Sequence, residues 1–212
     1  MPVYIVAGQS NAVGVAYDLG VSTRGWTFRD VADGWYRIAD PFDPDPVARG
    51  SWVVPLAAQM PEAGWIPAAA NATRISEWAA GTPAYTRMVA RGRASGRPIT
   101  AVLWWQGESD RIEQTPRDEY ELALADLVRR IGVDLGAPVL IATIGPDVRY
   151  DVAGSAAVRD SQASCSTRCP NARQGPDFSD VPSLADGLHF RTPAEVGIAV
   201  AKWAIAMRAA NL

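Results

Sequence analysis

Three mostly apolar runs restrict what this chain can fold into, because none of them alternates polar with apolar side chains. They are residues 3–7 (VYIVA), 99–105 (ITAVLWW) and 138–144 (PVLIATI). Runs of this kind are typical of strands that are buried on both faces of a parallel sheet. Because parallel strands need crossover connections, usually helices, the sequence predicts an α/β fold with helices on both faces of a central parallel sheet.

Helix signals lie between and after these runs. Thr115 can cap a helix whose first position is Pro116, and a single apolar stripe then continues until Gly136, a typical helix stop. Near the end of the chain, Thr192 and Glu195 form a capping box ahead of a long apolar run. The alternation of predicted strands and helices favours a doubly wound arrangement.

Two weaker signals fit the same alternation. Residues 83–96 predict a further helix, and residues 65–69 (WIPAA) predict a further short strand. Residues 20–70 are instead rich in proline and aromatic side chains, which predicts a long loop that covers or builds a site. Its aromatic rings would either stack on sugars or pack beneath the loop.

Length and charge exclude several classes of protein. With 212 residues, of which 48% are hydrophobic, the chain is expected to form one domain over residues 1–212. A net charge of −3 offers no cationic surface for nucleic acid or anionic lipid, and we expect no nucleic-acid or membrane partner. No apolar stretch approaches the roughly 20 residues that span a bilayer, and the start of the chain is expected to be a core strand, not a signal peptide. Localisation and oligomeric state stay open.

The cysteine and histidine content argues against a metal site. Cys165 and Cys169 are the only cysteines and His189 is the only histidine, too few for a structural zinc site. The two cysteines are compatible with a short disulfide in an exported protein and equally with two thiols.

Polar motifs follow two of the predicted strands. Residues 8–14 (GQSNAVG) form a turn of small residues after the first run, with Ser10 exposed in it. Residues 106–110 (QGESD) follow the run 99–105. Ligands of open α/β sheets bind at the carboxyl ends of the strands, so we expect the two loops to face each other there.

A nucleophilic serine needs a base, and histidine is the usual one because its charge changes near neutral pH. His189 lies in the motif DGLH before the last predicted helix, and Asp186 lies three residues ahead of it. A carboxylate there can hold the second ring nitrogen. Each motif alone is typical of an ordinary turn or cap, but the three together predict a Ser10–His189–Asp186 site.

At these residues the chain resembles the SGNH-hydrolase superfamily, within it the sialate O-acetylesterase-like proteins and carbohydrate esterase family six. The resemblance rests on GQSN at residues 8–11, WQGESD at residues 105–110 and DGLH at residues 186–189. It implies a three-layer α/β/α flavodoxin-like fold, no cofactor, and an acetylated carbohydrate as the partner. The implied reaction is deacetylation of acetylated xylan or acetylated sialic acid through an acyl-enzyme.

The resemblance also implies an oxyanion hole. Its donors would be the backbone amide of Ser10, a backbone amide of the second family motif and the side-chain amide of Gln106. We align that second motif with residues 71–78, where Asn71 and Ala72 replace the usual pair of glycines. In carbohydrate esterase family six a glutamate can orient the histidine, so Glu108 is a second candidate for that role.

Other functions are compatible with the same motifs. A lipase-like or thioesterase SGNH enzyme would act on acyl chains, and comparing acetyl with octanoyl esters separates it from an acetylesterase. A sugar-binding module whose activity has lapsed is another alternative, because a fold does not determine function. The spacing around Ser10 disfavours the α/β-hydrolase nucleophile elbow G-x-S-x-G.

Overall fold

The computed structural model describes residues 1–17, 22–29, 34–145, 153–181 and 184–212. A seven-stranded sheet lies at its centre in the order β3-β2-β4-β1-β5-β6-β7, and only the β2–β3 pair is antiparallel. The strands are β1 (Val3–Gly8), β2 (Ser22–Arg29), β3 (Gly34–Ala39), β4 (Gly64–Pro67), β5 (Ala101–Trp105), β6 (Val139–Thr143) and β7 (Ala172–Asp177).

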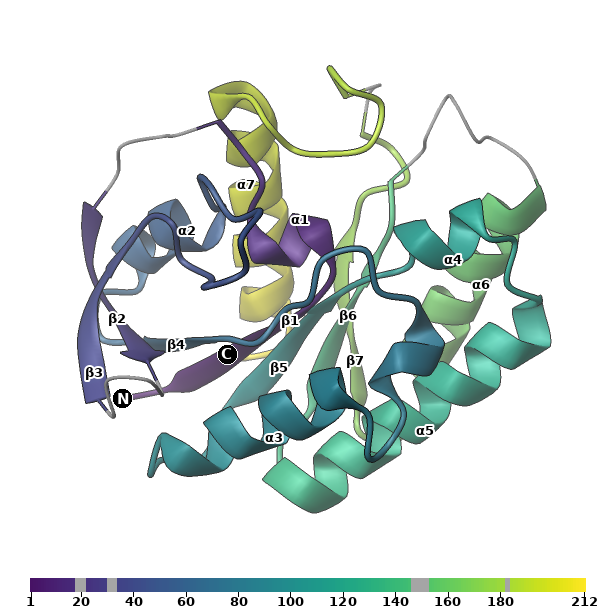
Figure 1. Ribbon diagram of the computed structural model, residues 1–212, viewed down its shortest axis with the longest axis horizontal. Coiled ribbons are helices and arrows are strands. Elements are labelled where there is room, and N and C mark those ends of the chain that lie inside the picture. The colour runs from purple at the N-terminus through teal and green to yellow at the C-terminus, as the bar shows by residue number, and fades with distance from the viewer. Residues whose placement is uncertain (18–21, 30–33, 146–152, 182–183) are drawn as a thin grey trace.

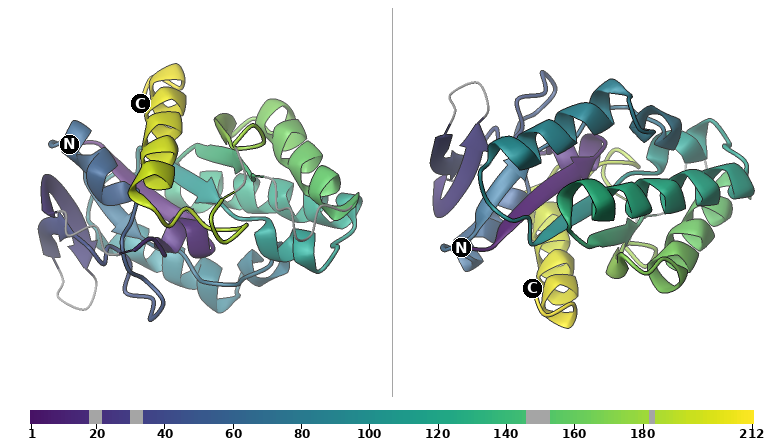
Figure 2. Two further views of the ribbon diagram at one scale, coloured as in Figure 1. Left: turned by 90° about the horizontal axis from the view of Figure 1, so that it is seen from above. Right: turned by 90° about the horizontal axis from the view of Figure 1, so that it is seen from below.

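Helices cover both faces of this sheet (Figures 1 and 2). α3 and α5 lie on one face, where α6 packs beside α5, and α2 and α7 lie on the other. The helical elements are α1 (Ser10–Val13), α2 (Val53–Gln59), the 3-10 helix η2 (Ile75–Trp78), α3 (Pro83–Ala94), α4 (Glu108–Ile112), α5 (Arg117–Leu135), α6 (Ala153–Arg168) and α7 (Pro193–Ala209). The predicted α/β/α class is therefore confirmed.

The three apolar runs form β1, β5 and β6, and every residue of these strands is buried. The expected weaker strand and helix are β4 and α3. Both capped helices are present as α5 and α7, although Pro116 is the N-cap of α5 and not its first helical residue. Gly136 ends α5 with a φ of 64°, a left-handed conformation that glycine adopts readily.

The prediction of one long loop over residues 20–70 is wrong for the described part of that segment; residues 20, 21 and 30–33 lie outside it. β2, β3, α2 and β4 occupy much of the segment. Trp52 and Trp65 are buried in the core, and Trp26 packs under the Arg37 guanidinium at 4.2 Å. Most of these rings therefore pack against the protein. An antiparallel pair at the sheet edge has one solvated face, so it lacks the continuous apolar signal of the inner strands.

The carboxyl ends of β1 and β5 approach closely. Gly8, with a φ of 127°, lies so near Trp105 that a Cβ there would come within 1.9 Å of the Trp105 carbonyl oxygen. The backbone N–H of Gln9 donates to that same oxygen at 2.9 Å. This contact brings the turn that carries Ser10 against the loop that follows β5.

No helix in the described ranges is long and apolar enough to cross a membrane. Cys165 and Cys169 are free thiols near the end of α6, with 2.9 Å between their Sγ atoms. Among the described residues, no group of three or more His, Cys, Asp or Glu side chains is arranged to hold a metal ion.

Candidate active site

Ser10 is the first residue of α1 and follows β1 after a single residue, Gln9. Its Oγ lies 3.0 Å from Nε2 of His189, which comes from the loop before α7. In Figure 1 this loop lies above α1. Residues 179 positions apart therefore meet at hydrogen-bond distance, a geometry in which a neutral imidazole can accept the serine proton.

Asp186 holds the other side of the imidazole ring. Its Oδ2 lies 2.8 Å from His189 Nδ1, and its Oδ1 accepts the backbone N–H groups of Leu188 at 2.9 Å and His189 at 2.7 Å. Gly187, with a φ of 78°, closes this turn. The Arg191 Nε donates to the same Oδ2 at 2.5 Å.

Two opposing effects act on the Asp186 carboxyl. Burial alone raises its pKa, but hydrogen bonds from the backbone and ring of His189, from Arg191 and from the backbone of Leu188 together lower the pKa well below its ordinary range. Asp186 is therefore a carboxylate at neutral pH. A carboxylate on Nδ1 selects the tautomer that leaves Nε2 free to accept a proton from Ser10.

Asn11 connects the Ser10 turn to the histidine loop, a role that we did not predict. Its side-chain nitrogen donates to the Leu188 carbonyl at 3.2 Å, and its side-chain oxygen accepts the Phe190 N–H at 3.3 Å. The Trp52 indole donates to its backbone carbonyl at 2.9 Å. The only sequence signal for this role of Asn11 was that a polar residue stands in a turn of small residues. The role itself depends on a contact with Leu188, 177 positions along the chain.

Glu108 lies behind Asn11. Its Oε1 accepts the Asn11 side-chain amide at 2.8 Å, and its Oε2 is buried without a hydrogen-bond partner among the described residues. The carboxylate hydrogen-bonded to His189 is that of Asp186. Of the two candidate orienting carboxylates, the geometry therefore supports Asp186, and Glu108 instead braces the turn that carries Ser10.

The second motif lies beside this pair of loops. We expected the Asn71 N–H to be a possible oxyanion donor. It instead donates to Asp45 Oδ2 at 3.2 Å, so it is not available to a substrate. Ala72 has a φ of 55°, a left-handed conformation that glycine adopts more readily. Within the described residues, neither the Ala72 N–H nor the Ser10 N–H has an acceptor. Two backbone donors thus remain for an oxyanion.

The Gln106 side chain does not offer the donor that the sequence predicted. Gln106 is fully buried, and its amide nitrogen lies 3.0 Å from the Thr73 carbonyl and 2.5 Å from Asp110 Oδ2. An amide nitrogen has two hydrogens, so these two acceptors use both. Its oxygen accepts the Tyr120 hydroxyl at 3.1 Å. The prediction of Gln106 as an oxyanion donor is therefore not supported by the geometry.

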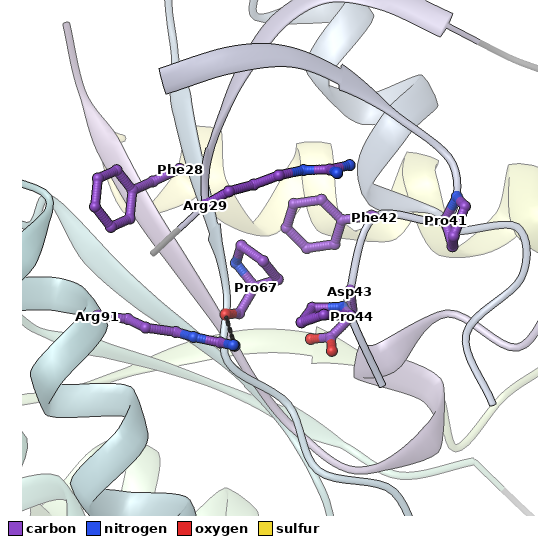
Figure 3. A pocket seen from close by; sticks show the side chains of 8 residues that line it. All are labelled: Phe28, Arg29, Pro41, Phe42, Asp43, Pro44, Pro67 and Arg91. Atoms are coloured by element: carbon purple, nitrogen blue, oxygen red, sulfur yellow. Dashed lines mark hydrogen bonds between the residues drawn. The ribbon is translucent and has the colours of Figure 1, made fainter. Parts of the chain in front are cut away.

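A cavity of about 190 Å³ opens between the end of β2, the segment after β3, the end of β4 and α3. Figure 3 shows its lining, in which Arg91 donates to the Pro67 carbonyl at 2.7 Å. The lining residues are Phe28, Arg29, Pro41, Phe42, Asp43, Pro44, Pro67 and Arg91.

This cavity is connected to the second motif. Asp43 Oδ2 accepts the N–H of Ala69 at 3.3 Å, and Ala69 lies two residues before Asn71. Burial raises the pKa of Asp43 to about 6, against the lowering effect of the Asp45 backbone N–H and of Arg91. Apolar rings, guanidinium groups and a carboxyl are thus combined in one concave surface, as in sites that bind polar ligands with flat apolar faces.

Comparison with known proteins supports an esterase. A family model described as carbohydrate esterase, sialic acid-specific acetylesterase (SASA) matches residues 50–207. The "Probable carbohydrate esterase At4g34215" of Arabidopsis thaliana is 32% identical over 138 residues, or 63% of this chain and 51% of that protein. The match thus spans about half the length of the plant relative.

Solved structures show the same fold. The structure of the Arabidopsis thaliana protein AT4G34215 has a TM-score of 0.80 at 22% identity, covering 98% of both chains. A novel carbohydrate acetylesterase from Xanthomonas citri has a TM-score of 0.63 at 18% identity, covering 98% of this chain and 56% of that one. The psychrotrophic esterase EstA from Pseudoalteromonas sp. has a TM-score of 0.62 at 14% identity, covering 99% and 98%. The arrangement is that of SGNH hydrolases.

Proposed function

Because this chain belongs to the SASA family of carbohydrate esterases, we propose that it is a serine esterase that removes O-acetyl groups from a carbohydrate. The observation that carries the proposal is the chain of contacts from Ser10 Oγ to His189 Nε2 at 3.0 Å and from His189 Nδ1 to Asp186 at 2.8 Å. This arrangement of nucleophile, base and orienting carboxylate is the one that acyl transfer requires.

The first half of the reaction forms an acetyl-enzyme. Ser10 Oγ attacks the acetyl carbonyl carbon while His189 Nε2 takes the hydroxyl proton, and the carbonyl oxygen becomes an oxyanion. The free backbone N–H groups of Ser10 and Ala72 stabilise that charge. When the tetrahedral intermediate collapses, the bond to the sugar oxygen breaks and His189 returns the proton to it, which releases the sugar alcohol.

The second half regenerates the enzyme. A water molecule attacks the acetyl carbon of the ester on Ser10, and His189 takes one of its protons. Collapse of this second intermediate breaks the bond to Ser10 Oγ, which recovers the proton, and acetate leaves. Asp186 keeps its negative charge throughout and stabilises the imidazolium.

Three observations support a carbohydrate as the alcohol part. The family description names a carbohydrate esterase, and the plant and Xanthomonas relatives carry carbohydrate esterase or acetylesterase names. The cavity in Figure 3 also combines rings with hydrogen-bonding groups close to the second motif. Acetylated xylan and acetylated sialic acid are the two substrates that we propose to compare.

The proposed function is tested with purified full-length protein on an aryl acetate, acetylated xylan and acetylated sialic acid. We expect acetate release from the aryl ester and from at least one glycan, and loss of both in Ser10→Ala. Turnover of an aryl octanoate is compared with turnover of the aryl acetate, because a rival hydrolase of acyl chains would prefer the longer ester. Glycan binding without any ester hydrolysis would instead support a lapsed binding module and contradict the proposal.

A further inference from the structure

Arg191 follows His189 after one residue, and its side chain lies against the Asp186–His189 pair. Its Nε donates to Asp186 Oδ2 at 2.5 Å, the same oxygen that lies 2.8 Å from His189 Nδ1. A terminal guanidinium nitrogen lies 3.5 Å from Nδ1 itself. Because Nδ1 carries the hydrogen that is directed at Asp186, it has no lone pair for Arg191 in this tautomer. This contact therefore places a cation beside the imidazole ring.

The backbone of Arg191 is held on both sides. Its N–H donates to Glu195 Oε2 at 2.9 Å, and its carbonyl accepts the backbone N–H of Tyr17, an exposed residue after α1, at 2.9 Å. The Arg191 side chain is 33% exposed, so water hydrates the guanidinium only in part. An arginine is charged at every pH at which the protein is folded, and solvent and salt screen a partly buried charge less than an exposed one. The ring is therefore next to a permanent positive charge.

Carboxylates of the neighbouring helices are engaged elsewhere. Glu195, in the first turn of α7, accepts three backbone N–H groups from residues that precede it. Glu108 of α4 accepts the side-chain amide of Asn11. Among the described residues, the charged groups in contact with the imidazole are therefore Asp186 and Arg191. They act in opposite directions, because the carboxylate favours a positive charge on the ring and the guanidinium opposes it.

We propose that Arg191 keeps His189 uncharged, and so able to accept the Ser10 proton, at lower pH than the triad alone would allow. The proposal rests on the esterase function proposed above and adds a control of its pH range. Arg191 contacts no reacting atom; it acts through Asp186 and His189 and is a positioning residue. The step that it influences is the transfer of the hydroxyl proton from Ser10 Oγ to His189 Nε2, during which the ring becomes cationic.

The discriminating variant is Arg191→Met, which keeps an unbranched side chain and removes the charge. His189 is the only histidine, so proton NMR follows the protonation of its ring directly and without any turnover. We expect the midpoint of this titration, and that of the acid limb of kcat/KM for an aryl acetate, to rise together by roughly one pH unit. Two backbone N–H groups still hold Asp186, so kcat at the high-pH plateau should stay within about threefold of the wild type.

Two further variants control this measurement. Arg191→Lys keeps a cation at the same position and should retain most of the wild-type midpoint. Arg168→Met removes an equal charge at the end of α6, where the arginine side chain is 77% exposed, and should leave both midpoints unchanged. Circular dichroism and thermal unfolding check folding, and the neutral variant Arg191→Gln serves as the test variant if Arg191→Met does not fold.

The outcomes separate this proposal from the esterase function. Midpoints of a folded, neutral Arg191 variant that fall, or that stay within about 0.2 pH units of the wild type, overturn the role of Arg191 and leave the esterase intact. A loss of kcat that is equal at every pH, with an unchanged midpoint, would show a merely structural role and overturn the proposal as well. Equal background rates for the wild type and Ser10→Ala overturn the esterase, and the NMR midpoint then decides by itself whether Arg191 controls the charge of His189.

Discussion

The side-chain amide of Asn11 donates a hydrogen bond of 2.8 Å to Glu108, and this contact directs the glutamate toward the Ser10 turn instead of toward His189. Asp186 is the carboxylate on the imidazole, at 2.8 Å. The motif Q-G-E-S-D after β5 therefore serves chiefly to brace the nucleophile turn and the second motif. In the proposed mechanism, the imidazole is oriented by Asp186 in the loop before α7.

This division of roles predicts unequal losses in two isosteric variants. Asp186→Asn removes the charge that stabilises the imidazolium and favours the wrong tautomer, so kcat should fall by about 10⁴-fold, as it does when the orienting aspartate of a serine protease is replaced by asparagine. Glu108→Gln keeps an oxygen for Asn11 and should cost about tenfold or less. The measurement is kcat on an aryl acetate, with folding checked by circular dichroism. A larger loss in Glu108→Gln would reverse the assignment.

Acidification should remove activity in one proton step. A protonated His189 cannot accept the Ser10 proton, so kcat/KM should fall with a slope of one on the acid side. Asp186 does not cause this limb, because its hydrogen bonds lower its pKa and it stays charged.

The same pKa shift sets the pH dependence of stability. Asp186 contributes stability that is fully present above the unfolded-state pKa of about 3.9 and is lost as the pH falls toward its lower folded-state pKa. Activity should thus disappear while circular dichroism still reports a folded protein. Loss of both at the same pH would contradict this account.

The buried network around Gln106 should matter for stability as well as for rate. Gln106→Leu removes one buried hydrogen bond from each of Asp110, the Thr73 carbonyl and the Tyr120 hydroxyl. Such losses typically cost about 2–4 kcal/mol in the free energy of unfolding. Urea denaturation measures this change, with Gln59→Leu as the exposed control. A loss below about 0.5 kcal/mol would show that the network is not stabilising.

The cavity in Figure 3 should contribute to glycan binding only. Arg29 is exposed, and its side chain extends over Phe42 at the cavity. Arg29→Ala should raise KM several-fold for the acetylated glycan that the enzyme prefers, the effect of one hydrogen bond of roughly 1 kcal/mol. KM for an aryl acetate should not change. Arg168→Ala, on the exposed end of α6, is the control, and equal effects on both substrates would exclude a sugar subsite here.

The sequence was sufficient for the inner part of the fold. β1, β5 and β6 are buried on both faces and so carry a continuous apolar signal, and α5 and α7 carry cap residues at their ends. The β2–β3 pair was not predicted, because an edge pair with a solvated face has a weak hydrophobic pattern. Helix α6 was not predicted because small and polar residues dominate its sequence.

The candidate site could be predicted only as far as residue types and order allow. Ser10, Asp186 and His189 stand out because serine, aspartate and histidine in this order along the chain have few other joint roles. The direction of an amide does not follow from sequence. Gln9 and Gln106 carry the same group, and only their hydrogen bonds show that the Gln106 nitrogen donates internally while the Gln9 oxygen accepts from the loop after β5.

The most direct test of the central claim is covalent labelling of the nucleophile. An aryl phosphonate ester should react with an activated serine at the rate at which activity is lost, with release of one equivalent of aryl alcohol. Digestion and mass spectrometry should then locate one phosphonyl group on Ser10, and Ser10→Ala and His189→Ala should stay unlabelled while folded. An active enzyme that is labelled at another residue, or an Ser10→Ala variant that retains turnover, would contradict the account.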